Sequence, residues 1–251
     1  MFNEVYGKGM EFFESKSCAD TAREIAHQPE MWEKLSSYLN EVQPEIKAFM
    51  DKLEPLKNYR IVLTGAGSSG FIGSTVAGFA AQKAGVQCEA IHTTSIVTAP
   101  ETCLFANTPT ILISFGRSGN SPESVGAVEY AREVVKDLYE IAIVCDGTSK
   151  LAAATRGNDK GLVLVMPEGT NDKGFAMTSS VSTMMLAGFA TLCHCEIDKI
   201  AADILLLADQ VKKPARTLQK PQKNVPKWTW SVHGTWAAAR LRPLFRKARL
   251  K

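Results

Sequence analysis

The sequence predicts an α/β protein, a three-layer α/β/α sandwich around a five-stranded parallel sheet of the flavodoxin-like type, preceded by N-terminal helices. From residue 60 to about 195, short apolar runs alternate with helical periodicity, which indicates a doubly wound sheet. The apolar runs are rich in Ile, Val and Leu, as strands covered on both faces must be. We expect strands at Arg60–Thr64, Gln87–Ile91, Thr110–Ser114, Glu140–Cys145 and Leu162–Met166.

Helical patterns precede, separate and follow these strands. In the first 58 residues we expect a short amphipathic piece over Ser17–Ile25, a break at Gln28-Pro29-Glu30, and a new helix with Pro29 as its first residue. The apolar face of residues 30–53 is expected to pack on the sheet or on a partner subunit. Later helices are expected at Phe71–Ala84, Pro122–Val135, Ser149–Ala154, Met177–Leu192 and Ala201 to about Leu218.

Composition places the chain among ordinary globular proteins. It has 251 residues, of which 45% are hydrophobic and 22% charged, and no apolar run approaches the ~18 residues of a membrane helix. The N-terminus lacks the basic and apolar regions of a signal peptide, so we expect a cytoplasmic protein with free thiols and no membrane partner. The run Cys193-His194-Cys195 has no second ligand pair at zinc spacing, which favours a helix end over a metal site.

Charge is distributed unevenly along the chain. No Asp or Glu follows Asp209, yet 12 of the 29 Lys and Arg residues do, which leaves 17 basic against 26 acidic residues before that point. Residues 220–251 also hold three of the four tryptophans. We expect this basic tail to be poorly ordered and dispensable. A nucleic-acid arm is the alternative, but the acidic body argues against it, so no nucleic-acid partner is expected.

The first candidate binding loop is Gly65-Ala66-Gly67-Ser68-Ser69-Gly70, between the first strand and a helix expected from about Phe71. It matches G-x-G-x-x-G, but the dinucleotide version needs an acidic residue at the end of the second strand. That strand ends Ala90-Ile91-His92, with Glu89 inside it. Ser68 and Ser69 also place hydroxyls where a dinucleotide loop needs only backbone. We therefore predict no nicotinamide, flavin or other cofactor.

The second candidate loop is rich in hydrogen-bond donors. It follows the third strand and contains Ser114, Arg117, Ser118, Asn120 and Ser121, with a helix opening at Pro122. Hydroxyls and backbone N–H groups at a helix N-terminus suit a phosphate monoester, and the Arg117 guanidinium can add charged donors. A solvated turn with an N-cap serine is the alternative. Two such loops at one sheet edge favour a small phosphorylated ligand.

A third polar segment runs from Met166 to Ser180, after the fifth strand and before an apolar helix. Two roles are open for Thr178, Ser179 and Ser180. They could cap that helix, or they could line the same pocket from its far side.

Three of these motifs together resemble a known family. The Gly-Ala-Gly-Ser-Ser loop, the Ser-Phe-Gly-Arg-Ser-Gly-Asn-Ser-Pro-Glu-Ser loop and the Asp-Lys-Gly-Phe-Ala-Met-Thr-Ser-Ser segment are similar to those of the sugar isomerase (SIS) domain. More narrowly, they resemble the bacterial tagatose-6-phosphate ketose/aldose isomerase family, also described as galactosamine-6-phosphate deaminase/isomerase. The lead-in Thr21-Ala22-Arg23-Glu24-Ile25 and the run His92-Thr93-Thr94 are similar too. The resemblance covers about residues 18–210.

The resemblance implies a role for each matching position. Ser68 and Ser69 would face the phosphate side of the sugar, while Ser118 and Ser121 would hold the phosphate with Arg117 beside them. The stretch Phe175–Ser179 would close over the sugar. The predicted binding residues are therefore Gly67, Ser68, Ser69, Ser114, Arg117, Ser118, Asn120, Ser121, Thr178 and Ser179.

Members of this family carry two SIS domains, and the second supplies a Glu and a His for proton transfer. By this resemblance, residues 1–58 form a helical lead-in and residues 59–219 the first SIS domain. Residues 220–251 form the atypical basic tail in place of a second SIS domain. The comparison predicts a truncated C-terminus.

The resemblance implies a sugar-phosphate isomerase or deaminase acting on a hexose or amino-hexose 6-phosphate, such as galactosamine-6-phosphate or tagatose-6-phosphate, by aldose–ketose isomerisation. Such a reaction needs a base that moves a proton between neighbouring carbons. His92 is a titratable candidate, and a structural histidine at a strand end is the alternative, so no catalytic residue is assigned. A non-catalytic sugar-phosphate-binding module is the alternative function. We also expect a homo-oligomer.

Overall fold

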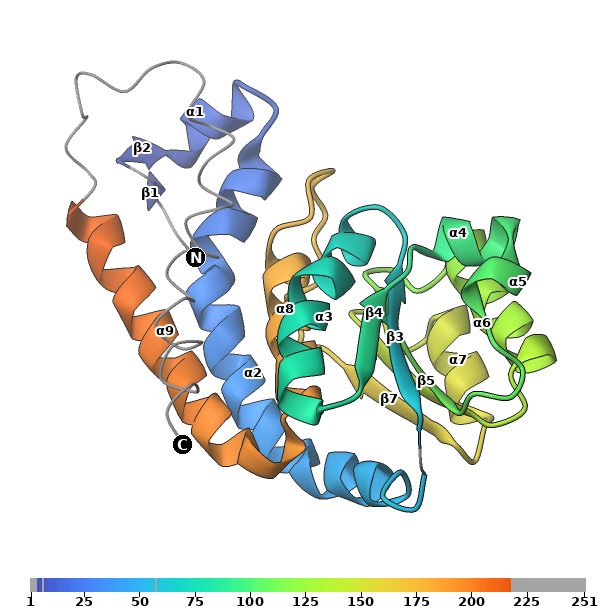
Figure 1. The fold of residues 1–251 in the computed structure, drawn as a ribbon. Helices are drawn as coiled ribbons and strands as arrows, with labels where there is room; N and C mark the ends of the chain where they lie inside the picture. The colour runs from blue at the N-terminus through green and yellow to red at the C-terminus, as the bar shows by residue number, and fades with distance from the viewer. Residues whose placement is uncertain (1–3, 6, 57, 218–251) are drawn as a thin grey trace.

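The computed structural model describes residues 4–5, 7–56 and 58–217, and its centre is a five-stranded sheet in the order β4-β3-β5-β6-β7 (Figure 1). All four strand pairs are parallel. This arrangement confirms the predicted α/β class and parallel sheet. The strands are β3 (Arg60–Gly65), β4 (Gln87–Ala90), β5 (Thr110–Gly116), β6 (Leu138–Val144) and β7 (Gly161–Val165).

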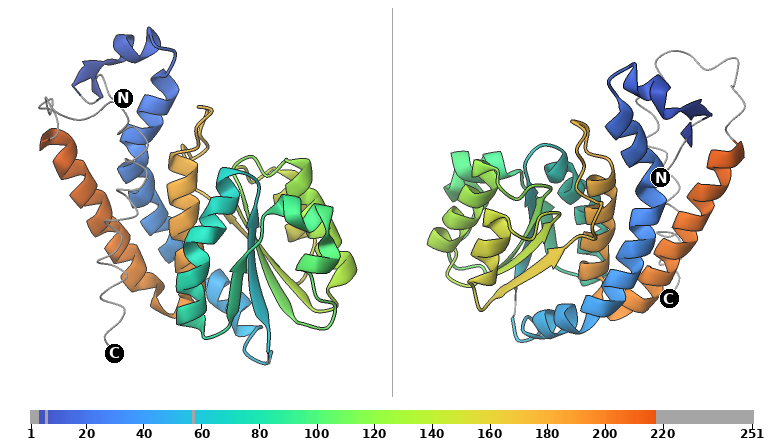
Figure 2. Two further views of the ribbon diagram at one scale, coloured as in Figure 1. Left: turned by 45° about the horizontal axis from the view of Figure 1, so that its top comes forward. Right: turned by 180° about the vertical axis from the view of Figure 1, so that it is seen from behind.

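Helices cover both faces of the sheet, as Figure 2 shows. Helices α3 (Ser68–Ala84) and α8 (Ser179–Leu192) lie on one face. The opposite face is covered by α4 (Thr93–Thr98), α5 (Pro100–Cys103), α6 (Pro122–Val134) and α7 (Lys150–Arg156). Outside α8 lies an antiparallel pair, α2 (Ala19–Asp51) and α9 (Ile197–Thr217), which adds an outer helical layer to the sandwich.

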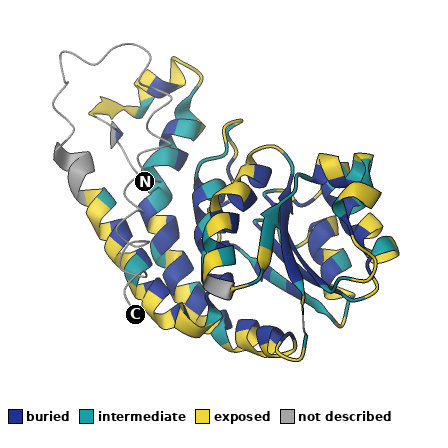
Figure 3. Ribbon diagram, in the orientation of Figure 1, coloured by how far each residue is buried: buried dark blue, intermediate teal, exposed yellow. Residues whose placement is uncertain are grey.

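Side-chain alternation along the strands builds two cores. Ile61 and Leu63 of β3 join the core under α2, α3, α8 and α9, whereas Val62 joins the core under α4, α6 and α7. The central strands β3, β5 and β6 are buried along their whole length, and the edge strands β4 and β7 are partly exposed (Figure 3). Burial on both faces explains why the central strands are nearly continuous apolar runs.

The predicted helix break at Gln28-Pro29-Glu30 is wrong, because α2 continues through Pro29 to Asp51. A proline inside a helix has no N–H for the carbonyl four residues earlier, which here is that of Ile25. The side-chain amide of Gln28 donates to this carbonyl at 3.3 Å. A neighbouring side chain thus replaces the missing backbone hydrogen bond, and the helix does not need to end.

The apolar face of α2 is covered within the chain. Leu35, Leu39 and Ile46 are fully buried, and α2 packs on α8 and α9. Near its C-terminal end, Phe49 makes an edge-to-face contact with Tyr139 of β6, with ring centroids 6.3 Å apart. The sequence left open whether this face packs on the sheet or on a partner subunit, and in the described residues it packs on other elements of the same chain. The expected homo-oligomer stays a prediction, and this buried face is no longer an argument for it.

Several shorter elements lie outside the sequence prediction. The chain begins with a small antiparallel hairpin of β1 (Glu4–Val5) and β2 (Lys8–Gly9), followed by α1 (Met10–Glu14). Helices α4 and α5 occupy residues 93–103, for which no element is predicted, and a 3₁₀ turn, η1 (His194–Glu196), links α8 to α9. Helix α3 begins at Ser68, three residues before the predicted start, so Ser68 and Ser69 belong to its first turn.

The predictions for the basic tail fall on residues outside the described part of the chain, and the proposed divisions at residues 58/59 and 219/220 stay predictions. Across the described residues, no helix is both long and apolar enough to cross a membrane. The same residues contain no group of three or more His, Cys, Asp or Glu side chains arranged to hold a metal ion.

Candidate functional site

The two predicted binding loops lie on either side of the point in the sheet where the order of strand addition reverses. The chain passes from β3 outward to β4 and then returns to β5 on the other side of β3. The register pairs Gly65 with Phe115, so the loops that follow β3 and β5 leave the same edge side by side. Ligands of open parallel sheets bind at such a switch point, beyond the carboxyl ends of the strands.

The first loop turns directly into helix α3. Gly67 has a φ of 54°, a backbone conformation that favours glycine, and Ser68 beside it is exposed. Ser69 is buried, and its N–H donates to the carbonyl of Ala66 at 3.1 Å. Of the two predicted serines in this loop, Ser68 therefore has the hydroxyl that faces solvent.

His92 lies against the same loop, just after β4. It precedes α4, is half-buried, and makes an edge-to-face contact with Phe71, with ring centroids 5.6 Å apart. The ring also packs on Gly70, where a Cβ atom would overlap it. The structure thus brings His92 to the candidate site and gives it a packing role there.

The second loop is held in shape by its own polar side chains. Ser114 is buried at the end of β5, and Ser118 is exposed, where its hydroxyl accepts from the N–H of Asn120 at 3.3 Å. The side-chain oxygen of Asn120 accepts from the N–H of Lys150 at 2.9 Å, which fixes the loop to the start of α7. Ser121 caps α6, because its hydroxyl accepts from the N–H of Ser124 at 3.3 Å.

Arg117 joins the second loop to the third segment. Its Nη1 donates to the carbonyls of Asp172 and Gly174, at 3.3 and 3.2 Å. These bonds hold the segment after β7 against the loop after β5. In the structure this guanidinium nitrogen contacts backbone rather than pointing freely into solvent.

Asp172 caps helix α8, which is one of the two roles that the sequence left open for Thr178, Ser179 and Ser180. Its buried carboxylate accepts from the N–H groups of all three residues, at 2.9, 3.1 and 2.9 Å. It also accepts from the hydroxyls of Thr178 and Ser180, at 3.3 and 2.5 Å. A single carboxylate thus satisfies three N–H groups that a helix start leaves unpaired.

Ser179 ties α8 to α2. It is fully buried, and its hydroxyl donates to the carbonyl of Glu24 at 2.7 Å. The same hydroxyl lies 2.7 Å from Nε2 of His27. Because its one hydrogen is used on Glu24, it accepts from His27, which therefore carries a hydrogen on Nε2. This contact places Ser179 between two helices.

A thiol lies beside this polar network. Cys145 follows β6, and its N–H donates to the carbonyl of Gly116 at 3.2 Å. Burial raises the pKa of the Cys145 thiol to about 12, with a smaller contribution from the charge of Asp172. The thiol is neutral at ordinary pH and acts as an apolar wall next to the loops.

The structure brings the predicted residues of the first two loops to one edge of the sheet. Ser68 and Ser118 are exposed there beside Gly67, whereas Ser69 and Ser114 are buried. Side-chain atoms of the remaining predicted residues, and of Ser118, make contacts within the protein; these residues are Arg117, Asn120, Ser121, Thr178 and Ser179. Sequence reasoning missed Glu24, His27 and Asp172, whose partners lie up to 155 positions apart along the chain. The available signal was an acid, Asp172, shortly before a helix start.

The chain is similar in sequence to known proteins. A family model described as "SIS domain" matches residues 56–193. The D-galactosamine-6-phosphate deaminase AgaS of Escherichia coli is 42% identical over 170 residues, which is 68% of this chain and 44% of that protein. The D-galactosamine-6-phosphate deaminase AgaS of Shewanella sp. (strain ANA-3) is 45% identical over 170 residues, 66% of this chain and 44% of its own.

The chain is also similar to a solved structure. The tagatose-6-phosphate ketose/aldose isomerase of Escherichia coli superposes with a TM-score of 0.75 at 38% identity, covering 79% of this chain and 53% of its own. The chain thus spans about half the length of the proteins it matches. The residues that the family model matches, 56–193, include the whole sheet and the loops at its carboxyl edge.

Proposed function

Because this chain belongs to the SIS domain family, we propose that its carboxyl-edge loops bind the phosphate of a hexose 6-phosphate or amino-hexose 6-phosphate. The observation that carries the proposal is the placement of the loops after β3 and β5 on either side of the switch point. Within this proposal, Gly67, Ser68, Ser69, Ser114, Ser118 and Ser121 form the phosphate side of the site.

Helix geometry supports an anionic ligand there. Helices α3 and α6 begin directly after the two loops, and the positive ends of their dipoles point toward the switch point. Exposed hydroxyls on Ser68 and Ser118 add neutral donors that can turn toward a phosphate oxygen. A phosphate monoester accepts several such bonds at once.

The reaction that we propose is aldose–ketose isomerisation of the bound sugar phosphate. When the substrate is an amino sugar such as galactosamine-6-phosphate, water then hydrolyses the resulting imine, which releases ammonia and leaves the ketose phosphate. The relatives named as deaminases and as a ketose/aldose isomerase support this reaction class. A general base must transfer a proton between neighbouring carbons. His92 stays the titratable candidate on this chain, since it lies half-buried against the first loop.

Calorimetric titration with a hexose 6-phosphate tests the binding proposal. The double variant Ser118→Ala, Ser121→Ala should weaken binding at least tenfold, because each hydrogen bond to a charged group contributes about 1.5–3 kcal/mol. Ser37→Ala is the matched control, since this exposed serine lies on α2 and bonds within its own helix. Unchanged affinity in the double variant would place the phosphate elsewhere.

A second measurement separates turnover from binding alone. Purified chain is incubated with galactosamine-6-phosphate, and ammonia and ketose phosphate are both measured. Formation of both supports the isomerase and deaminase proposal. Tight binding without either product supports the non-catalytic binding module instead.

A further inference from the structure

We propose that Glu24, on a helix outside the sheet sandwich, is a positioning residue of the sugar-phosphate site. Its carboxylate sets the conformation of residues 173–178, the segment that lies beside the second loop. This inference rests on the proposed function, and it adds that the segment determines binding of the sugar more than binding of the phosphate.

Gly174 is held at both of its backbone polar groups. Its N–H donates to the two carboxylate oxygens of Glu24, at 3.0 and 3.2 Å, and the N–H of Lys173 donates to the same carboxylate at 2.6 Å. On the other side, the carbonyl of Gly174 accepts from Arg117 at 3.2 Å. A carboxylate thus binds the N–H of Gly174 and a guanidinium binds its carbonyl, both through charge-assisted hydrogen bonds.

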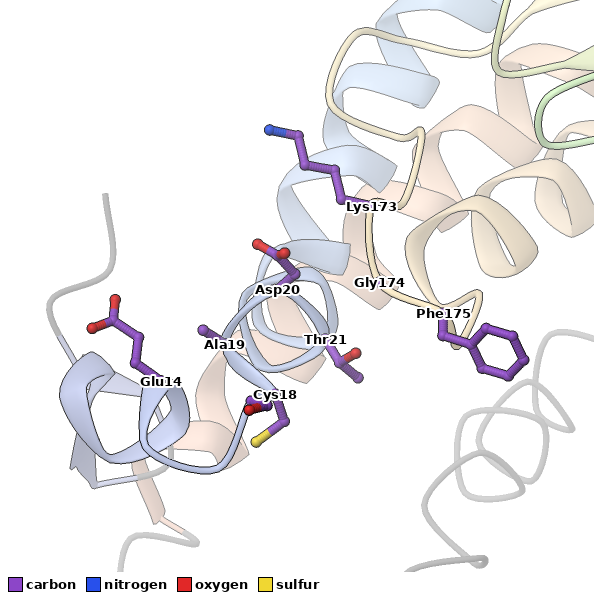
Figure 4. A pocket seen from close by; sticks show the side chains of 9 residues that line it. Glu14, Cys18, Ala19, Asp20, Thr21, Lys173, Gly174 and Phe175 are labelled. Carbon is purple, nitrogen blue, oxygen red and sulfur yellow. The ribbon is translucent and has the colours of Figure 1, made fainter.

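The position of the Glu24 carboxylate leaves no room for a side chain at residue 174. A Cβ atom there would lie 2.7 Å from a carboxylate oxygen of Glu24 and 2.7 Å from the hydroxyl of Thr21. Figure 4 shows Lys173, Gly174 and Phe175 passing the first turn of α2, where Thr21 lies. Glu24 itself is only 7% exposed, so its charge is stabilised by these contacts rather than by water.

The segment borders open space. Between it and the start of α2 lies an open pocket of about 520 Å³, lined in part by Cys18, Asp20 and Lys173. The side chain of Phe175 is fully exposed, and its ring points away from Thr21 (Figure 4). With open space on one side, the position of the segment depends on the hydrogen bonds of Glu24, Arg117 and Asp172.

The position of the hydrogen bonds between Glu24 and residues 173 and 174 predicts different effects on the sugar half and the phosphate half of a ligand. The hydroxyls of Ser68 and Ser118 lie on the loops after β3 and β5, whereas the hydrogen bonds of the Glu24 carboxylate within the described residues go to Lys173 and Gly174. Loss of the Glu24 carboxylate should therefore leave the phosphate side in place and displace the segment opposite it. Inorganic phosphate and a hexose 6-phosphate are the two probes that distinguish these effects.

The experiment compares Glu24→Ala and Glu24→Gln with the control Glu30→Gln, which changes an exposed glutamate on the same helix. Glu24→Ala should weaken hexose 6-phosphate binding about tenfold or more and change inorganic phosphate binding less than about threefold. Glu24→Gln keeps one acceptor oxygen and should restore much of the lost affinity. Equal losses for both probes, or no loss for either, would overturn the proposal.

Hydrogen exchange gives a readout that is independent of ligand. The amides of Lys173 and Gly174 should exchange faster in Glu24→Ala than in the wild-type chain, while the amides of β3 and β5 should not change. Unchanged exchange at residues 173 and 174 would overturn the positioning role. Failure of the wild-type chain to bind either probe would instead contradict the proposed function, and the exchange result would still decide whether Glu24 holds the segment.

Discussion

The imidazole of His92 lies directly on the backbone of Gly70, so closely that a Cβ atom at residue 70 would overlap the ring. The same Cβ atom would come within 2.9 Å of the carbonyl oxygen of Gly65. Gly70 has an ordinary helical position in the first turn of α3, so close packing rather than backbone conformation excludes a side chain there. The first turn of α3 and the residues that follow β4 are thereby packed together.

We predict that Gly70→Ala destabilises the protein by about 1–3 kcal/mol, the usual cost of forcing extra atoms into a packed site. Gly78→Ala is the matched control, because it lies on the same helix, is exposed, and its Cβ would meet no described atom within 4 Å. That substitution should stabilise by about 0.5–1 kcal/mol, as helix propensity dictates. Urea unfolding of both variants measures the effects, and shifts of equal sign would contradict the prediction.

Removal of the Asp172 carboxylate should destabilise the start of α8. Asp172→Ala leaves three N–H groups without their acceptor, and we expect a loss of about 2–3 kcal/mol in the free energy of unfolding. The comparison variant is Asp198→Ala, an exposed acid in the first turn of α9, which should cost less than about 1 kcal/mol. Equal losses in the two variants would show that Asp172 acts through its charge alone.

Thiol reactivity should follow burial. Burial raises the pKa of both Cys145 and Cys88 to about 12, and the thiolate is the reactive form. At pH 8 both side chains are protonated in the folded protein, so iodoacetamide should label the exposed Cys195 first. Peptide mass spectrometry before and after denaturation checks this order, and rapid labelling of Cys145 in the folded protein would contradict it.

Addition of millimolar NAD should leave the melting temperature unchanged. The acid nearest the end of β4, Glu89, is paired with the buried guanidinium of Arg60 at 2.7 Å, whereas a dinucleotide site needs a carboxylate available to the ribose. Thermal unfolding with and without NAD is the measurement. An increase of several degrees would show that the first loop binds a dinucleotide.

Local pattern was sufficient to predict the sheet, because β3 and β5 are buried on both faces and must be apolar along their length. It was not sufficient for Pro29, where the side chain of Gln28 compensates for the missing N–H. The loops that follow β3 and β5 were also predictable, since each combines a strand end, small polar residues and a helix start. Whether they bind phosphate stays a prediction.

The contacts of Glu24 and Asp172 differ in how far local sequence could predict them. The carboxylate of Glu24 meets amides 149 and 150 positions later in the chain, and nothing in the local sequence marks that pairing. Asp172 reaches its partners six to eight residues ahead, across a turn whose shape depends on Arg117. The Glu24 pairing exists only once the fold has brought the two segments together, whereas the Asp172 contacts are local and were signalled by an acid shortly before a helix start.

The hydrogen bonds between Glu24 and Gly174 also bear on the order of folding. They join residues 150 positions apart, and closing so long a loop costs entropy before any contact repays it. All five strands of the sheet lie between the two residues in the sequence, so we expect these hydrogen bonds to form after β3 to β7 have paired. Residues 173–178 are synthesised long after α2, and we expect the segment to reach its final position late in folding.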